Sequence, residues 1–515
     1  METAPLLASE FVPFVELLRR NAAEHPDSIA ISDSRGALTW RAFDDRIDRI
    51  AARLLERGVG EGDTIALLGY NAVGYVLAFC AALRIGAVAV PLTSSATPTA
   101  IAAMIADCGA AHLFLDRAAG ESLSGVDLAS AIERIAFDDS HAGTPIREWM
   151  APAGARPQPI AIDPDAPFNV IYSSGTTGMP KGIVQSHGMR AGHIRRAMAS
   201  GYDENAVTLI STPLYSNTTL VSLIPALAGG GRVVLMEKFD ARRFLETAVA
   251  EKVTHAMLVP AQYQRLMALP DFDAFDLSRF RYKSCTSAPF SAALKRDIVR
   301  RWPGQLVEVY GMTEGGGTCL LSATEYPDKL HTVGQPAPGH DIRLIDPDGK
   351  EVPRGAVGEV VGRSEMMMTG YRNRQDATRQ AEWRDAEGRR FIRHGDIGRF
   401  DEDGFLILMD RAKDMIISGG FNVYPSDLEA ELIREPEVAE AAVVGVPSEL
   451  WGETPVAFVV LRDATAEPQS ILSSVNARLG RTQRISAIHS LDELPRSAIG
   501  KVLKRELRER IHTTS

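Results

Sequence analysis

Residues 173–182, SSGTTGMPKG, combine two serines, two threonines, three glycines and a lysine directly after the apolar run FNVIY at 168–172. A loop that leaves a buried strand with this composition can surround an anion with backbone N–H groups, hydroxyls and an ammonium. The usual phosphate loop, G-x-x-x-x-G-K-[ST], is not matched, because Pro180 lies five residues after Gly175 and Gly182 follows Lys181. The stretch therefore predicts a phosphate-binding loop of another kind.

Helical and strand patterns alternate on both sides of this loop. Helical periodicity marks RAFDDRIDRIAARLLERG at 41–58, and TIALLG at 64–69 is typical of a buried strand. The most apolar stretch, VLAFCAALRIGAVAVPL at 76–92, carries Arg84 and one glycine and has a proline near its end, so we expect a buried helix and a strand rather than a bilayer span of about 20 apolar residues. From residue 232 the segments RVVLME, ARRFLETAVAEK, THAMLV, AQYQRLMAL and QLVEVYG continue the alternation. This order predicts a parallel α/β sheet.

The pattern changes after about residue 330. Turn-rich segments such as DPDGKEV, GEVVGR and DEDGF predict a small antiparallel barrel or sheet. The run DRAKDMIISGGFN at 410–422 resembles a linker, and beyond it PSDLEAELIRE, AAVVGV, PVAFVVL, QSILSSVNARLG and KVLKRELRERI predict a separate α+β domain. We therefore expect an α/β protein with a large N-terminal domain of parallel α/β subdomains and a β-barrel-like subdomain at 1–410, a connecting segment at 411–414 and a small α+β domain at 415–515.

Composition restricts the classes of function. The chain has 515 residues, 45% of them apolar and 24% charged, with a net charge of −10. An acidic chain is a poor ligand for a nucleic-acid backbone, so no nucleic-acid partner is expected. The four scattered cysteines have no C-x-x-C spacing and predict buried free thiols. The N-terminus lacks the pattern of a signal peptide. We expect a cytoplasmic protein without an integral membrane segment, and we keep a homodimer among the partner predictions.

Several further motifs follow predicted strands or turns. They are YGMTE at 310–314, TSAPF at 286–290, RHGDIG at 393–398, DRAKD at 410–414, SGGFNVYP at 418–425 and PRSAIGK at 495–501. With SSGTTGMPKG, these motifs make nearly the whole chain resemble the adenylate-forming superfamily, which contains acyl- and aryl-CoA ligases, luciferases and adenylation domains of peptide synthetases. One motif departs from the family, because His394 stands where a threonine is usual.

The resemblance implies a role for each motif. The loop residues Ser173, Ser174, Gly175, Thr176, Thr177, Gly178 and Lys181 would shield the β- and γ-phosphates of ATP, so the α-phosphorus is attacked and pyrophosphate leaves. Ser287, Ala288 and Pro289 would form the adenine loop, Tyr310 would stack on adenine, and Thr313 would contact the α-phosphate. Glu314 would hold Mg²⁺, a hard cation that prefers carboxylate and phosphate oxygens. Asp396 and Arg411 would bind the ribose.

The C-terminal motifs imply two half-reactions. Lys501 would bridge the acid and the α-phosphate during adenylation. Gly419 and Gly420 would then face the pantetheine arm of coenzyme A, after the small domain has turned about Lys413. The family resemblance thus implies that 411–414 is a hinge and that the small domain at 415–515 is mobile. The expected reaction joins an aryl or medium-sized carboxylic acid to CoA through an acyl adenylate, and consumes ATP with Mg²⁺.

The acid itself is less defined. Tyr215 keeps an aromatic residue in PLYSNTTL at 213–220, whereas Ser216 replaces a histidine common in related ligases. Gly315, Gly316 and Gly317 follow YGMTE, where the family lines its acyl pocket, and predict a roomy site. These segments hold no cluster of Arg or His that would pair a second carboxylate. Two alternatives stay open: transfer of the acyl group to an amine or to a carrier-protein thiol, and a nucleotide-binding protein without turnover, which the presence of Lys501 and Glu314 disfavours.

Overall fold

The computed structural model describes residues 11–128, 132–173, 180–411, 414–418, 421–448, 451–463, 466–480, 483–497, 500 and 502–513. The chain forms two compact units, each described here by itself. Unit 1 comprises Met1–Leu330, Ala337–Asp341 and Gly362–Ile392, and unit 2 comprises His331–Pro336, Ile342–Val361 and Arg393–Ser515. Unit 2 thus takes in segments before residue 410 that the sequence analysis assigned to the large domain, and the predicted domain limits stay a prediction.

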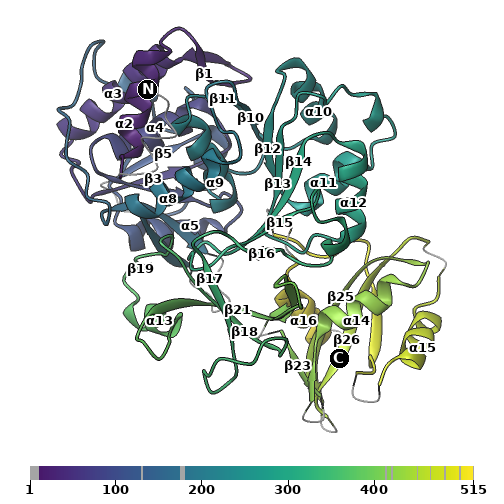
Figure 1. Cartoon of the computed structure of the whole chain (residues 1–515). Helices are drawn as coiled ribbons and strands as arrows, with labels where there is room; N and C mark the ends of the chain where they lie inside the picture. Colours follow the sequence, from purple (N-terminus) through teal and green to yellow (C-terminus); the bar gives the residue numbers. More distant parts are fainter. Residues whose placement is uncertain are drawn as a thin grey trace. The chain divides into compact units, whose positions relative to one another are not determined.

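Two sheets form the framework of unit 1 (Figure 1). The first runs in the order β15-β14-β13-β12-β10-β11-β1-β2. Its strands are β1 (Ile29–Asp33), β2 (Gly36–Thr39), β10 (Val207–Ile210), β11 (Arg232–Leu235), β12 (His255–Leu258), β13 (Tyr282–Cys285), β14 (Gln305–Tyr310) and β15 (Cys319–Ser322). Strands β14 to β1 pair in parallel, and the edge strands β15 and β2 are antiparallel.

The second sheet of unit 1 has the order β19-β9-β8-β4-β3-β5-β6-β7. Its strands are β3 (Thr64–Leu68), β4 (Val88–Leu92), β5 (His112–Leu115), β6 (Glu133–Ala136), β7 (Thr144–Pro145), β8 (Pro167–Ser173), β9 (Lys181–Ser186) and β19 (Gly370–Tyr371). Pairing is parallel from β8 to β7 and antiparallel at β8–β9 and β9–β19. The predicted parallel α/β architecture is confirmed.

Helices connect and cover these strands. They are α2 (Phe14–Glu24), α3 (Trp40–Glu56), α4 (Val73–Arg84), α5 (Pro98–Cys108), α6 (Arg117–Ser122), α7 (Ile146–Trp149), α8 (His187–Met198), α9 (Asn217–Ala228), α10 (Ala241–Ala250), α11 (Pro260–Met267), α12 (Ala292–Arg301) and α13 (Gln375–Gln380). Helix α4 is buried along its whole length, as its apolar sequence predicts. Helices α10, α11 and α12 pack in succession beside strands β12 to β14 (Figure 1).

The sequence of the amphipathic helix α3 explains where the helix begins and which of its faces is buried. Thr39 caps its N-terminus by accepting a hydrogen bond from the backbone N–H of Ala42. Its apolar stripe, which includes Phe43, Ile47 and Ile50, is fully buried. The buried Arg84 of α4 pairs with Asp44 and Asp48 of α3, so the single charge within the apolar stretch at 76–92 is neutralised by its neighbouring helix.

Unit 2 contains antiparallel strands and the C-terminal α+β segment. Its elements are most of β17 (Asp341–Ile345), β18 (Gly358–Arg363) and β21 (Arg390–Phe400), with β22 (Leu406–Arg411), β23 (Ile416–Ser418), β24 (Phe421–Val423), β25 (Val438–Ser448), β26 (Gly452–Leu461), β27 (Ala487–Ser490), α14 (Pro425–Ile433), α15 (Pro468–Arg478) and α16 (Lys504–Thr513). Strand β22 pairs antiparallel with β21, and β25 with β26. In unit 1, β20 (Glu382–Arg384) pairs with residues 390–392 of β21.

One prediction about this region is wrong. The run at 410–422 was expected to be a linker, but β23 and β24 pair within it, with Ile416 opposite Val423. Both side chains are buried in the apolar core of unit 2, and this burial outweighs the local glycines and charges. Two further predictions are confirmed: PSDLEAELIRE contains a helix, which begins at Pro425, and all four cysteines are free and buried. Among the described residues, every helix is too short or too polar to span a bilayer.

Candidate active site

Three of the predicted site motifs of unit 1 lie at one edge of the first sheet. Strands β10, β12, β13 and β14 are parallel neighbours, so their carboxyl ends share this edge. The segment with Tyr215 follows β10, the segment 286–290 follows β13, and Tyr310 ends β14. In parallel α/β sheets this edge is where ligands bind. The structure thus brings together three motifs that lie up to about a hundred residues apart in the sequence.

Side-chain contacts connect two of these segments. Ser216 caps α9 by accepting from the backbone N–H of Thr218, and the Thr218 hydroxyl lies 2.6 Å from the Ser287 hydroxyl. Ser287 has a positive φ of 82°, which a residue other than glycine rarely adopts. Residues with strained backbone conformations of this kind are frequent at functional sites. The predicted adenine loop is therefore held against the start of α9, and the serine that replaces histidine there has a structural role.

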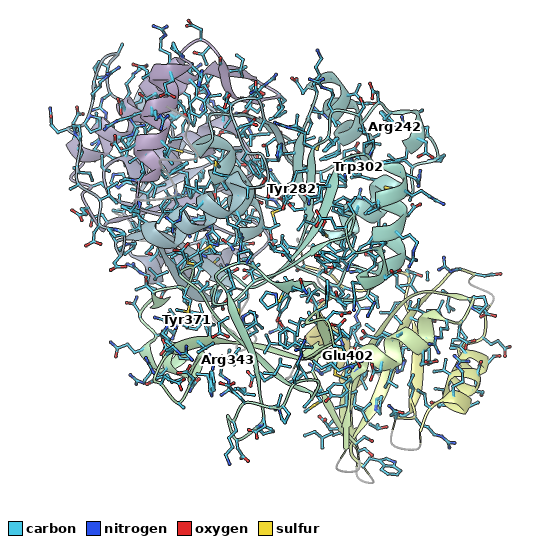
Figure 2. The ribbon with its side chains drawn as sticks, in the orientation of Figure 1. Arg242, Tyr282, Trp302, Arg343, Tyr371 and Glu402 are labelled. Atoms are coloured by element: carbon cyan, nitrogen blue, oxygen red, sulfur yellow. The ribbon has the colours of Figure 1, made fainter. Side chains whose placement is uncertain are left out.

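The phosphate-loop motif joins β8 to β9. Ser173 and Lys181 are opposite partners in this antiparallel pair. Of the predicted loop residues, Ser174, Gly175, Thr176, Thr177 and Gly178 lie outside the described residues. The Lys181 ammonium lies 5.1 Å from the centre of the Tyr371 ring, and the Tyr371 hydroxyl donates to Oε1 of Glu314 at 2.8 Å. Tyr371, labelled in Figure 2, thus lies between the lysine of the phosphate loop and the predicted magnesium ligand.

Tyr371 and Gln185 were missed by the sequence analysis. Burial, and then the Glu314 carboxylate, raise the pKa of Tyr371, so the phenol remains a donor to that carboxylate. Gln185, fully buried on β9, donates from Nε2 to the backbone carbonyl of Thr313 at 2.7 Å. A glutamine directly after the apolar pair Ile183 and Val184 was the sequence feature that could have pointed to it. Both residues position the YGMTE segment.

We expect Tyr371→Phe to weaken the use of Mg²⁺-ATP without unfolding the protein. The variant removes only the hydroxyl that orients Glu314, and loss of a partner that orients a metal ligand typically costs about 10- to 100-fold in affinity or activity. The measurement is pyrophosphate release against Mg²⁺ concentration. Tyr326→Phe, a change at an exposed tyrosine, serves as the control. An unchanged Mg²⁺ requirement in Tyr371→Phe would contradict the positioning role.

Two of the three glycines after YGMTE, Gly315 and Gly316, have no open space at their Cβ positions, contrary to what the sequence suggested. Gly315 and Gly316 have positive φ angles of 75° and 89°. A Cβ on Gly315 would lie 2.0 Å from the carbonyl oxygen of Met366, and one on Gly316 would lie 2.7 Å from that of Gly362. Close approach of the segment 362–366 therefore explains these two glycines. Whether this run lines an acyl pocket stays a prediction.

We accordingly expect Gly315→Ala to reduce stability rather than to change selectivity. A left-handed conformation costs a non-glycine residue about 1–2 kcal/mol, and overpacking adds about 1–3 kcal/mol. Gly388, with φ of 77° and open space around its Cβ position, provides a matched control in which only the conformational cost applies. Urea unfolding of both variants separates the two costs. Equal losses of stability would mean that the contact with Met366 relaxes freely.

Unit 2 contains the predicted ribose site. Asp396 on β21 and Arg411 on β22 are directly opposite in the antiparallel register. Two residues chosen from separate motifs are therefore cross-strand neighbours. The predicted hinge residue Lys413, the loop residues Gly419 and Gly420, and Lys501 lie outside the described residues.

The residues present fit Mg²⁺ held mainly by a nucleotide. Within the described ranges, no group of three or more His, Cys, Asp or Glu side chains could hold a metal ion by itself. Mg²⁺ usually takes one or two carboxylates, with water and substrate phosphates completing its shell. Glu314 provides such a carboxylate, which accepts from Tyr371, and the ring of Tyr371 contacts the Lys181 ammonium.

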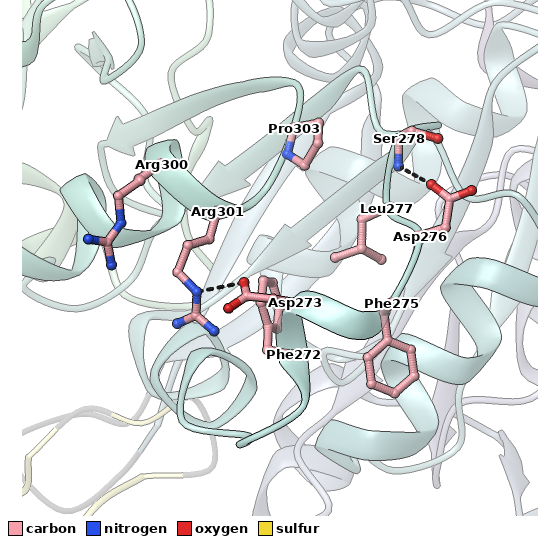
Figure 3. A pocket seen from close by; sticks show the side chains of 9 residues that line it. All are labelled: Phe272, Asp273, Phe275, Asp276, Leu277, Ser278, Arg300, Arg301 and Pro303. Carbon is pink, nitrogen blue, oxygen red and sulfur yellow. Dashed lines mark hydrogen bonds and ion pairs between the residues drawn. The ribbon is translucent and has the colours of Figure 1, made fainter.

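A surface hollow of about 630 Å³ lies elsewhere in unit 1 (Figure 3). Its lining includes Phe272, Phe275 and Arg301, and none of the predicted site residues. Arg301 is already bound to Asp273 at 2.8 Å, as Figure 3 shows. A shallow hollow whose arginine is neutralised in this way is a weaker candidate than the sheet edge described above.

Comparison with known proteins identifies the family of the chain. The family model of AMP-binding enzymes matches residues 18–372, and that of their C-terminal domain matches residues 427–501. The chain is 32% identical to indoleacetate–CoA ligase of Aromatoleum aromaticum, over 96% of this chain and 97% of that protein. It is 33% identical to feruloyl-CoA synthase of an Amycolatopsis species, over 95% and 97%.

Solved structures give the same result. The amide bond synthetase McbA of Marinactinospora thermotolerans superposes with a TM-score of 0.85 at 28% identity, covering 97% of this chain and all of that one. Matches of this length include both the sheet edge of unit 1 and the C-terminal segment. The chain therefore belongs to the family of AMP-binding, adenylate-forming enzymes.

Proposed function

We propose that the protein is an ATP-dependent acid:CoA ligase, which converts an aryl or medium-sized carboxylic acid into an acyl adenylate and then into an acyl-CoA thioester. The observation that carries the proposal is the arrangement of Lys181, Tyr371 and Glu314. The Lys181 ammonium of the phosphate loop contacts the Tyr371 ring, and the Tyr371 hydroxyl orients the Glu314 carboxylate, so one tyrosine connects the cation and the carboxylate that a magnesium–triphosphate needs.

The chemistry gives each group a task. A carboxylate is a poor acyl donor because oxide leaves badly, whereas AMP leaves readily from an acyl adenylate. Lys181 and the loop at 173–182 would hold the departing pyrophosphate, and Thr313, oriented through Gln185, would contact the α-phosphate. Mg²⁺, when bound, would neutralise charge on the phosphates. Asp396 and Arg411 would bind the ribose, and Lys501 would contact the reacting carboxylate.

The names of the relatives support the proposed class of acid and the proposed acceptor. Indoleacetate–CoA ligase and feruloyl-CoA synthase are named for aromatic acids, and a relative in Mycobacterium tuberculosis is a long-chain-fatty-acid–CoA ligase. These names support CoA as the acceptor and favour an aryl acid over acetate. Gly419 and Gly420 would admit the pantetheine arm. The cytoplasmic location and the homodimer stay predictions.

A second candidate function is amide synthesis, in which an amine attacks the acyl adenylate. The likeness to an amide bond synthetase with a TM-score of 0.85 favours it. The two functions share the first half-reaction and differ only in the acceptor.

A panel of aryl and aliphatic acids, tested for pyrophosphate release with CoA, with an amine and with neither, distinguishes them. We expect CoA-dependent AMP release and an acyl-CoA product that mass spectrometry detects. Amide formation without a thioester would favour the second function. ATP binding without pyrophosphate release for any acid would contradict both.

A further inference from the structure

Helix α8 carries an arginine whose charge is buried and largely unpaired. The Arg190 side chain is 1% exposed, and its Nε donates to Oδ1 of Asn169 at 2.9 Å. Nη1 and Nη2 are buried, and neither has a hydrogen-bond partner in the part of the chain that the structure describes. The guanidinium lies 5.9 Å from the centre of the Phe168 ring, a contact that compensates only part of the lost hydration.

An anion bound to the buried Arg190 guanidinium would stabilise its charge. Burial lowers the pKa of Arg190 to about 9, which leaves the guanidinium charged near neutral pH. A buried charge without a partner is strongly unfavourable, so proteins pair it or neutralise it. Because the two free nitrogens are terminal and adjacent, they match the two oxygens of a carboxylate.

More basic side chains surround this position: the Arg196 guanidinium and the imidazoles of His193 and His340, which burial keeps neutral near neutral pH. His193, one turn further along α8, is buried, and its Nδ1 has no partner among the described residues. Burial, and then the charges of Arg190, Arg196 and His340, lower the pKa of His193 well below its usual value. We call Arg190, His193, Arg196 and His340 the α8 basic cluster. Glu365, an acid that acts on His340, is mostly exposed and already accepts from Arg195 at 2.8 Å.

The α8 basic cluster borders the segment that follows β14. Nη1 of Arg196 donates to the Thr318 hydroxyl at 3.2 Å, and the Thr318 N–H donates to Nδ1 of His340 at 3.0 Å. At the other end, Asn169 donates to Oε1 of Gln185 at 3.0 Å, and Gln185 donates to the Thr313 carbonyl. Arg190 is thus linked through two amide side chains to the residue proposed to contact the α-phosphate.

From this juxtaposition we infer that the acid substrate carries a second carboxylate, which binds the α8 basic cluster while the first is adenylated. The inference rests on the proposed function and narrows its substrate class to dicarboxylic acids. The segments around Tyr215 and Gly315 hold no such cluster of Arg or His, so the sequence pointed away from this class. The cluster comes instead from α8 and His340, which the fold places beside residues 313–318.

Matched acids test the inference: benzoate against isophthalate and terephthalate, and hexanoate against adipate. We expect at least one diacid to exceed its monoacid in kcat/KM for ATP–pyrophosphate exchange by about 10- to 100-fold, the usual worth of charged hydrogen bonds. Arg190→Met should abolish this preference by lowering diacid use alone. Arg195→Met, on the same helix but paired with Glu365, is the control and should keep the preference.

The outcomes are distinct. A wild-type enzyme that prefers every monoacid, or an Arg190→Met variant that keeps the preference, would overturn the inference. If Arg190→Met lowers kcat/KM equally for monoacids and diacids and also lowers the urea midpoint, Arg190 has a purely structural role, and this result too would overturn the inference. If Arg190→Met does not fold, His193→Gln takes its place under the same expectation. If the enzyme binds ATP but none of the acids supports ATP–pyrophosphate exchange, the proposed function itself is rejected.

Discussion

Lys501→Ala should lower acyl-adenylate formation by about 100- to 1,000-fold, the usual range for a lost charge-stabilising donor. Thioester formation from synthetic acyl adenylate and CoA should stay near the wild-type rate, because the α-phosphate has by then been transferred. The match to the C-terminal family model extends to residue 501, and the ammonium of this lysine is proposed to contact the carboxylate and the α-phosphate. Pyrophosphate release and single-turnover thioester formation measure the two steps separately.

Two further variants make this prediction specific. Lys504→Ala changes a nearby lysine that pairs with Glu429 at 2.8 Å, and it should leave both steps intact. Lys413→Pro should give the reverse pattern, since proline fixes φ near −65° and the hinge could then adopt only one conformation. Equal loss of both steps in Lys501→Ala, or loss of the same step in Lys501→Ala and Lys413→Pro, would contradict a small domain that alternates between half-reactions.

Local sequence patterns predicted the elements of the fold well. The buried strand at 64–68 and the helix–strand pair at 73–92 appear where apolar runs required them. Motifs at strand ends were also predictable, because carboxyl ends of parallel strands must share an edge. The failure at 416–423 has a clear cause: two short strands were hidden by glycines and charges, and burial of Ile416 and Val423 decided their structure.

Contacts between distant segments were not predictable in the same way. Tyr371 reaches Glu314 only because β19 pairs with β9 beside the phosphate loop. The local sequence GYRN at 370–373 does not predict this contact. Likewise, the sequence of the helix that contains Arg190 has several charged residues, which is typical of a solvent-exposed face. Only the fold shows that Arg190 is buried. The space beside Gly315 was not predictable either, because it is filled by Met366, which lies 51 residues further along the sequence.

Glu314→Gln should reduce pyrophosphate release by about 100-fold or more and raise the Mg²⁺ concentration that gives half-maximal rate, since a metal ion supplies several kcal/mol of charge stabilisation. The amide keeps an oxygen that can accept from Tyr371, and the backbone carbonyl at 314 still accepts from the Met368 N–H, so the fold should persist.

The double variant Glu314→Gln/Tyr371→Phe sharpens this test. If Tyr371 acts only by orienting the carboxylate, its hydroxyl is worth little once the charge is gone, and the double variant should be about as active as Glu314→Gln alone. Glu325→Gln, at an exposed acid bonded to Gln305, controls for a change of net charge. An unaltered Mg²⁺ dependence in Glu314→Gln would remove this carboxylate from the magnesium site, while additive losses in the double variant would give Tyr371 a role independent of Glu314.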